Sequence, residues 1–166
     1  MHYAQSYRTQ EPPSLSAPSA SVPSRVGRGT GYVRDLSEPF ASEVQYTLSE
    51  VQGLENPVPR DAAILEMAAS VYQTNCSTCH GASGTGGGPM AEPLQVAGYG
   101  GTPANLATGG PTVNKSDGEV YLIVTDGFAG TYGLPADSFI MPPFKKLMTA
   151  EERWALVHYI RSLQGG

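Results

Sequence analysis

The sequence is poor in basic residues and in long apolar runs, and each shortage excludes a class of protein. The chain has 10 Lys and Arg residues and 15 Asp and Glu residues, which gives a net charge of −5. This charge argues against nucleic acid as a partner. No window approaches the roughly 18 uninterrupted apolar residues of a membrane-spanning helix. The opening stretch MHYAQSYRTQEPP has no apolar run either. We therefore identify no signal peptide, and expect a mature chain if the protein is exported.

Regular structure is also scarce in the first third of the chain. Gly and Pro together supply 34 of the 166 residues (20 plus 14), which favours one small domain with a long tail. Residues 1–58 show no helical or strand period and are rich in Ser, Pro and Gly, so they cannot bury enough apolar surface to offset their chain entropy. We expect an extended tail over 1–58, ordered only against partner subunits, and a folded domain over 59–166.

The tail has two features that fit either a docking segment or a solvated linker. Its basic residues lie in 1–34, whereas 35–58 carries only acidic ones. Aromatic residues are spaced along it: Tyr3, Tyr7, Tyr32, Phe40 and Tyr46. Both interpretations stay open at this point.

The folded part has three strong helix signals and almost no strand signal. Apolar residues recur at helical spacing after residue 61, after residue 116 and after residue 149. The predicted caps are Asp61, then Ser116 with Glu119, then Thr149 with Glu152, and Gly127 is expected to end the second helix. The sequence thus predicts an all-α domain of three to four short helices with long Gly-rich loops. Its own apolar core is too thin, so another group should fill the centre.

Both cysteines and a histidine lie in one pentapeptide, CSTCH at residues 76–80. A zinc site needs four ligands, and only His2 and His158 remain to complete one. A thioredoxin-like redox pair needs a βαβ setting, which the missing strands do not provide. A disulfide across this spacing closes a tiny loop and stabilises little.

Covalent attachment of haem c uses all three residues of the pentapeptide. On a helical turn Cys76 shares a face with Cys79 and with His80. The two thiols can then bond the two vinyl groups along one haem edge, while His80 places its imidazole under the iron. One haem would also fill the thin core. We further expect His80 to donate its other ring nitrogen to a backbone carbonyl of the irregular segment 89–103.

The second axial ligand of the iron is expected to be Met141. It lies in FIMPPF between the last two helices, where a loop stiffened by Pro142 can wrap the far side of the ring. Met90 follows the motif too closely to cross easily to that side. An iron with an open sixth position is one alternative. The other candidate ligands are Met67, Met90, Met148 and His158.

The motif and its surroundings resemble class I cytochromes c over residues 60–164. The resemblance rests on VYQTNCSTCHG, on MPPF and on the pattern WALVxYIRSL in the last helix. It implies that the first and last helices cross at right angles, with Ala68 and Tyr72 against Trp154 and Tyr159. The family's usual glycine at position 68 is alanine here. GTGGGPMAEPL and PANL resemble the bacterial subgroup of respiratory complexes, whose segment equivalent to 127–141 is shorter.

The tail resembles the N-terminal segment of the monohaem cytochrome c subunit of alternative complex III. This resemblance implies one-electron transfer by one covalent haem c in a membrane-bound quinol-oxidising complex, with no catalytic residue in the chain. It implies partners that include a multihaem cytochrome subunit and a periplasmic acceptor or an oxidase. It implies a location on the periplasmic side of the bacterial inner membrane, peripheral or anchored by an acylated cysteine before Met1.

Three other functions remain open. A free-standing or oxidase-linked electron carrier would need the same ligands but no complex. A haem enzyme or gas sensor would leave the sixth position of the iron open, so that Met141 would not be bound. A structural subunit would depend on its tail more than on its haem.

Overall fold

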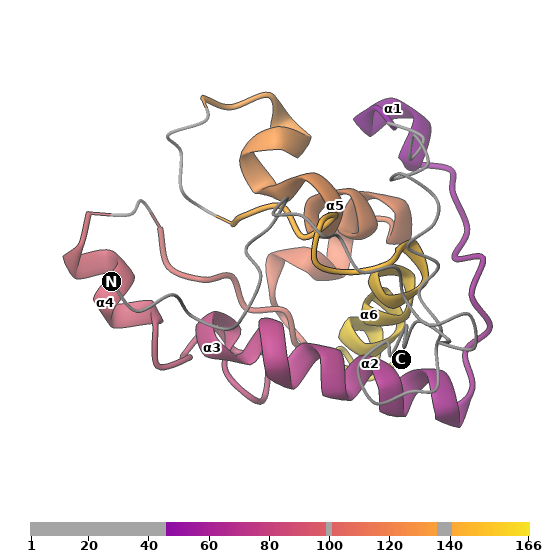
Figure 1. The fold of residues 1–166 in the computed structure, drawn as a ribbon, viewed down its shortest axis with the longest axis horizontal. Helices are drawn as coiled ribbons and strands as arrows, with labels where there is room; N and C mark the ends of the chain where they lie inside the picture. Colours follow the sequence, from indigo (N-terminus) through magenta and orange to yellow (C-terminus); the bar gives the residue numbers. More distant parts are fainter. Residues whose placement is uncertain (1–45, 99–100, 136–140) are drawn as a thin grey trace, which may run out of the picture. The chain divides into compact units, whose positions relative to one another are not determined.

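The computed structural model describes residues 46–98, 101–135 and 141–166, and over these ranges the chain is helical, with no strand. Figure 1 shows the arrangement of the helices. They are α1 (Leu48–Val51), α2 (Ala62–Asn75), α3 (Ser77–His80), α4 (Ala91–Val96), the 3-10 helix η1 (Pro111–Asn114), α5 (Asp117–Tyr132) and α6 (Ala150–Leu163). The predicted all-α class is confirmed. None of the helices in these ranges is long and apolar enough to cross a membrane.

Side-chain caps start the three long helices as predicted. Asp61 and Thr149 accept backbone N–H groups from the first turns of α2 and α6, which satisfies donors that a helix start leaves unpaired. Ser116 accepts the N–H of Glu119 at 3.1 Å. The Glu119 carboxylate, however, turns toward the Tyr132 hydroxyl, so only half of the capping box predicted for α5 forms.

Helices α2 and α6 form the central pair of the domain, and small residues lie where they meet. Ala68 and Ala155 are fully buried and belong to one cluster with Met67. Next to them, the rings of Tyr72 and Tyr159 approach to a centroid distance of 4.9 Å. The predicted packing of Ala68 and Tyr72 on the last helix is therefore confirmed.

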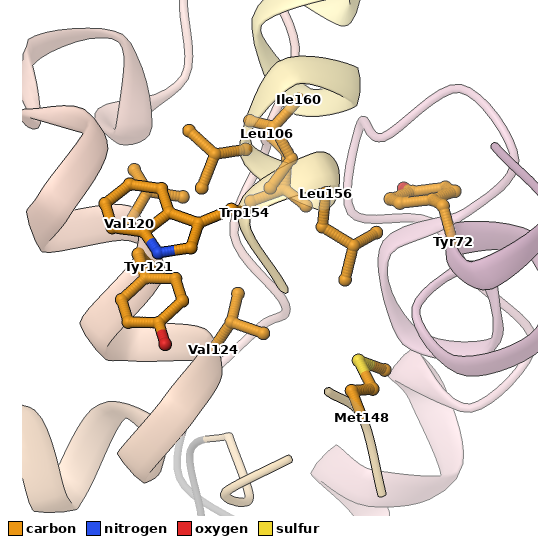
Figure 2. Close-up of a cluster of buried hydrophobic side chains, with 10 residues drawn as sticks. Tyr72, Leu106, Val120, Tyr121, Val124, Met148, Trp154, Leu156 and Ile160 are labelled. Carbon is orange, nitrogen blue, oxygen red and sulfur yellow. The ribbon is translucent and has the colours of Figure 1, made fainter. Parts of the chain in front are cut away.

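The Trp154 side chain faces α5 rather than α2. Its indole stacks on the ring of Tyr121, with centroids 4.1 Å apart and planes inclined by 11°. Figure 2 shows these two rings face to face, with Leu156 between Trp154 and Tyr72. Tyr72 and Trp154 share one buried cluster, in agreement with the predicted packing on this face of the last helix, and the stacking partner of Trp154 is Tyr121. Helical periodicity identifies a buried face but does not select which neighbour covers it.

Helix α5 is interrupted by a sharp bend at Gly127. Gly127 has φ 75° and ψ 168°, a conformation that favours glycine. The Tyr132 hydroxyl nevertheless reaches the Glu119 carboxylate, 13 residues earlier. A straight helix would hold these residues about 20 Å apart, too far for two side chains to span, so the chain must bend sharply at Gly127. The helix end predicted at Gly127 is this bend, and the chain leaves α5 at Gly133 in the left-handed conformation.

Residues 47–58, here called the strap, lie against α5 and α6. Val51 is fully buried, and its carbonyl oxygen fills the space that a side chain on Gly118 would need. The Asn56 side chain donates to the Trp154 carbonyl at 2.9 Å, and the Val58 carbonyl accepts from His158 Nε2 at 2.7 Å.

Because the strap packs on the helices, the folded domain begins earlier in the chain than the predicted boundary at residue 59. Its contacts with α6 join residues about a hundred positions apart. Such contacts leave no periodic signal in the local sequence, which is why this segment was predicted to be extended. The remainder of the predicted tail, residues 1–45, lies outside the described residues, and its docking on partner subunits stays a prediction.

Removing the strap should destabilise the domain, whereas removing residues 1–45 should not. Deletion of 1–58 uncovers the surface under Val51, whose burial alone is worth about 1.5–3 kcal/mol. It also removes the hydrogen bonds of Asn56 and Val58 to α6. Each kcal/mol should lower the Tm by roughly 4–8 °C. Thermal unfolding of the two truncated chains, followed by circular dichroism, measures the difference. Equal melting of both chains would show that the strap contributes nothing.

Candidate functional site

The pentapeptide forms one helical turn joined to α2 through Cys76. The Cys76 N–H still donates to the Tyr72 carbonyl at 2.8 Å, so the residue completes α2. The Cys76 carbonyl accepts the N–H groups of Cys79 at 3.1 Å and of His80 at 2.8 Å. Both cysteines are free thiols and half-buried. The three predicted site residues therefore lie together on a single turn.

A backbone carbonyl fixes the orientation of the His80 ring. Nδ1 of His80 lies 2.9 Å from the Ala104 carbonyl oxygen, and since a carbonyl only accepts, Nδ1 carries the proton. Burial lowers the pKa of His80, while the Ala104 hydrogen bond opposes that shift. A neutral imidazole results, with the lone pair on Nε2 available to a metal. The predicted acceptor type is confirmed, and Ala104 lies one residue beyond the predicted segment 89–103.

The environment of Cys76 keeps its sulfur protonated. Burial, and secondarily the neighbouring Cys79, raises the pKa of the Cys76 thiol to about 12. Redox-active and nucleophilic cysteines have the opposite property, because they react as thiolates with a lowered pKa. The thioredoxin-like alternative is therefore disfavoured by the position of Cys76 as well as by the absence of a βαβ unit from the described ranges.

A glycine-rich loop over residues 81–88 closes the end of the motif turn. The last carbonyls of a helix lack partners within it, and here the loop supplies them. Gly86 N–H donates to the His80 carbonyl at 2.8 Å, and Gly88 N–H to the Cys79 carbonyl at 3.1 Å. A side chain on Gly88 would overlap the Ser77 and Thr78 carbonyls, so glycine is needed for this approach. The sequence predicted this glycine-rich loop but not that its N–H groups bind the carbonyls of the motif turn. The run GTGGG was the only feature that could have indicated it.

Met141 lies at the edge of the same buried cluster as Cys76. Both side chains are partly buried and pack against the cluster that contains Tyr72, Trp154 and Leu156. The structure therefore brings the predicted distal ligand and the motif to one apolar region. Bonding of Met141 to iron stays a prediction.

The other candidate ligands have structural roles in the described part of the chain. Met148 is 3% exposed inside the main cluster, and Met67 belongs to the smaller cluster between α2 and α6. Met90 is 40% exposed at the start of α4. His158 is engaged with the Val58 carbonyl. These positions favour Met141 among the five candidates.

The chemistry of this donor set fits a haem c. Two thiols on one turn, a neutral imidazole with a fixed ring plane and a thioether from the loop before α6 are donors that such a group uses. Cys76, Cys79, His80 and Met141 would hold it. Within the ranges described, no three His, Cys, Asp or Glu side chains are grouped as a metal-ion site would require.

Comparisons with known proteins bear on the family to which the chain belongs. The family model described as Cytochrome c matches residues 65–164. A search of curated proteins finds no match. Among solved structures, the reducing HAO-like protein complex Kustc0457/Kustc0458 of Kuenenia stuttgartiensis has 30% identity and a TM-score of 0.50, over 67% of this chain and 49% of that one. The KustC0563 c-type cytochrome has 26% identity and a TM-score of 0.43, over 58% and 96%. The chain thus spans about half the length of the first of these.

The haem should remain bound to the denatured protein only when the motif cysteines are present. Extraction with acid and acetone should leave the haem on the wild-type chain, because thioether bonds are covalent. The variant carrying Cys76→Ser and Cys79→Ser should release all its haem or be obtained as colourless protein. Met141→Ala is the matched control and should retain its colour, since it leaves both thioethers intact. Colour that stays on the double variant would contradict covalent attachment through these two residues.

Proposed function

This chain belongs to the cytochrome c family, and we propose that it carries single electrons through one haem c bound by Cys76 and Cys79, with His80 and Met141 as axial ligands. The observation that carries this proposal is the His80–Ala104 hydrogen bond of 2.9 Å. It leaves the motif histidine neutral, with its ring held in one orientation and Nε2 free to bind.

The residues of the chain supply rigidity rather than acid–base chemistry. When bound, the haem supplies an iron that alternates between the ferrous and ferric states. His80 is held by Ala104 from one side and by the loop N–H of Gly86 at its own carbonyl. Met141 offers a thioether, which favours a high potential. Ligands held in the same way in both states need little reorganisation, so the chain functions as an electron carrier and not as an enzyme.

We extend the proposal to a membrane-bound quinol-oxidising assembly like alternative complex III. The support is the resemblance of the tail together with its length and its basic-then-acidic division of charge. A similar solved structure, the reducing HAO-like protein complex, is itself a multi-subunit assembly. In this proposal a multihaem cytochrome subunit donates electrons and a periplasmic carrier or an oxidase receives them. The chain would lie on the periplasmic side of the inner membrane, peripheral or lipid-anchored.

A free-standing or oxidase-linked carrier is the second candidate. The ranges 46–98, 101–135 and 141–166 contain all the proposed haem ligands, so binding of the haem itself requires no partner subunit. A haem enzyme or sensor with an open sixth position is less well supported, because Met141 lies at the edge of the cluster that also contacts Cys76.

Replacing Met141 should open the iron to external ligands. The oxidised wild-type protein should show the weak absorption band at the red edge of the spectrum that reports sulfur on ferric iron. Met141→Ala should lose this band, bind imidazole or carbon monoxide and have a lower potential. Met90→Ala is the control and should behave like the wild type, because Met90 is exposed at the start of α4. An unchanged spectrum in Met141→Ala would overturn the ligand assignment.

Deletion of residues 1–45 should separate the electron carrier from its assembly. The truncated chain keeps the strap and all four ligands, so its spectrum and Tm should match those of the full chain. Salt-washed membranes of the source cell should retain the full chain with its partner subunits and lose the truncated one. Equal retention of both would show that residues 1–45 make no assembly contact. A full chain found only in the soluble fraction would favour the free-standing carrier.

A further inference from the structure

The broken helix α5 and the loop that carries Met141 are joined by their backbones. In an unbroken helix the N–H of Phe128 would donate to the Val124 carbonyl. Here it donates to the Met141 carbonyl at 3.1 Å, and the Val124 carbonyl accepts the N–H of Phe144 at 3.0 Å. Lys145 N–H adds a bond to the Thr125 carbonyl at 3.2 Å. The loop thus replaces the hydrogen bonds that the break in α5 leaves open.

The backbone at Gly127 lies too close to the Met141 loop to leave room for a side chain. A Cβ on Gly127 would lie 2.5 Å from the Met141 carbonyl oxygen and 2.9 Å from the Pro143 nitrogen. The φ of Gly127 is 75°, so any other residue there would be strained as well as crowded. The loop is especially dependent on this contact, because Pro142 and Pro143 have no N–H with which to form hydrogen bonds of their own.

An ion pair also connects the Met141 loop to the residue before Gly127. Lys145 Nζ lies 2.7 Å from Asp126 Oδ1, with both side chains partly buried. The part of α5 after Gly127 is held by Tyr132, whose hydroxyl contacts both Lys115 and Glu119. Residues 126–128 are therefore fixed on one side by their own helix and contact the Met141 loop on the other.

We infer that Gly127, with the Asp126–Lys145 pair, positions Met141 for its bond to the haem iron. This inference rests on the proposed function, in which Met141 is the distal ligand. Gly127 and Asp126 touch neither the iron nor the haem in this inference. They hold the backbone from which the thioether extends, and so set how often Met141 leaves the metal.

The test uses the full-length, haem-loaded ferric protein and imidazole as the competing ligand. Gly127→Ala should raise the apparent affinity for imidazole by about tenfold, since strain in a conformation that is almost restricted to glycine would then favour the open loop. It should also weaken the sulfur-to-ferric absorption band and lower the potential. Gly133→Ala is the control for replacing a positive-φ glycine. Gly133 has φ 63° and ψ 31°, the ordinary left-handed conformation, and no heavy atom lies within 4 Å of its added Cβ.

A milder pair of variants covers the case in which Gly127→Ala does not fold. Lys145→Gln removes the ion pair and should shift imidazole affinity and the band in the same direction, and Lys145→Arg should restore both. Lys146→Gln alters an exposed neighbour and should match the wild type. Equal imidazole affinity of Gly127→Ala and Gly133→Ala, or of Lys145→Gln and Lys146→Gln, overturns the inference alone. A wild type without the sulfur band overturns both the inference and the ligand assignment on which it rests.

Discussion

The hydrogen bond from His80 Nδ1 to the Ala104 carbonyl is the constraint on which the site depends. It settles the tautomer of the ring and leaves Nε2 as the only nitrogen able to bind a metal. To supply that carbonyl, the chain after the motif must return past the imidazole within 24 residues. The glycines of this segment permit the return, because the backbone at Gly88 lies too close to Ser77 and Thr78 for any side chain. The glycines of this segment therefore serve the hydrogen bond that the Ala104 carbonyl makes with His80 Nδ1.

Much of the fold and most of the site could be predicted from local sequence. The caps at Asp61 and Thr149 are short-range hydrogen bonds, which residue identity alone specifies. The motif turn is equally local, because its three functional residues lie within five positions. The Ala68 and Tyr72 contacts with α6 were available only through a family resemblance, since helical periodicity does not name a partner.

Most of the features that were missed depend on residues far apart in the chain. The strap has no helical period, and it is held by the burial of Val51 and by hydrogen bonds with Trp154 and His158. Glu119 was expected to complete a cap, but the bend at Gly127 brings Tyr132 within reach of its carboxylate and the tertiary contact forms instead. A glycine in the sequence indicates that the backbone is free to turn. It does not indicate how sharply the next helical turn bends away from the previous one.

The strap also constrains the order in which the domain can fold. Its hydrogen-bond partners lie in α6, about a hundred residues later in the chain, and α2 packs on α6 as well. Contacts of such large sequence separation carry a loop-closure entropy that must be met before they stabilise anything. During synthesis, the strap and α2 emerge first, and their contacts with α6 cannot form until the last helix follows. The N-terminal part of the domain must therefore wait for the last helix, and a chain cut short before α6 would leave the motif on a segment without its packing partner.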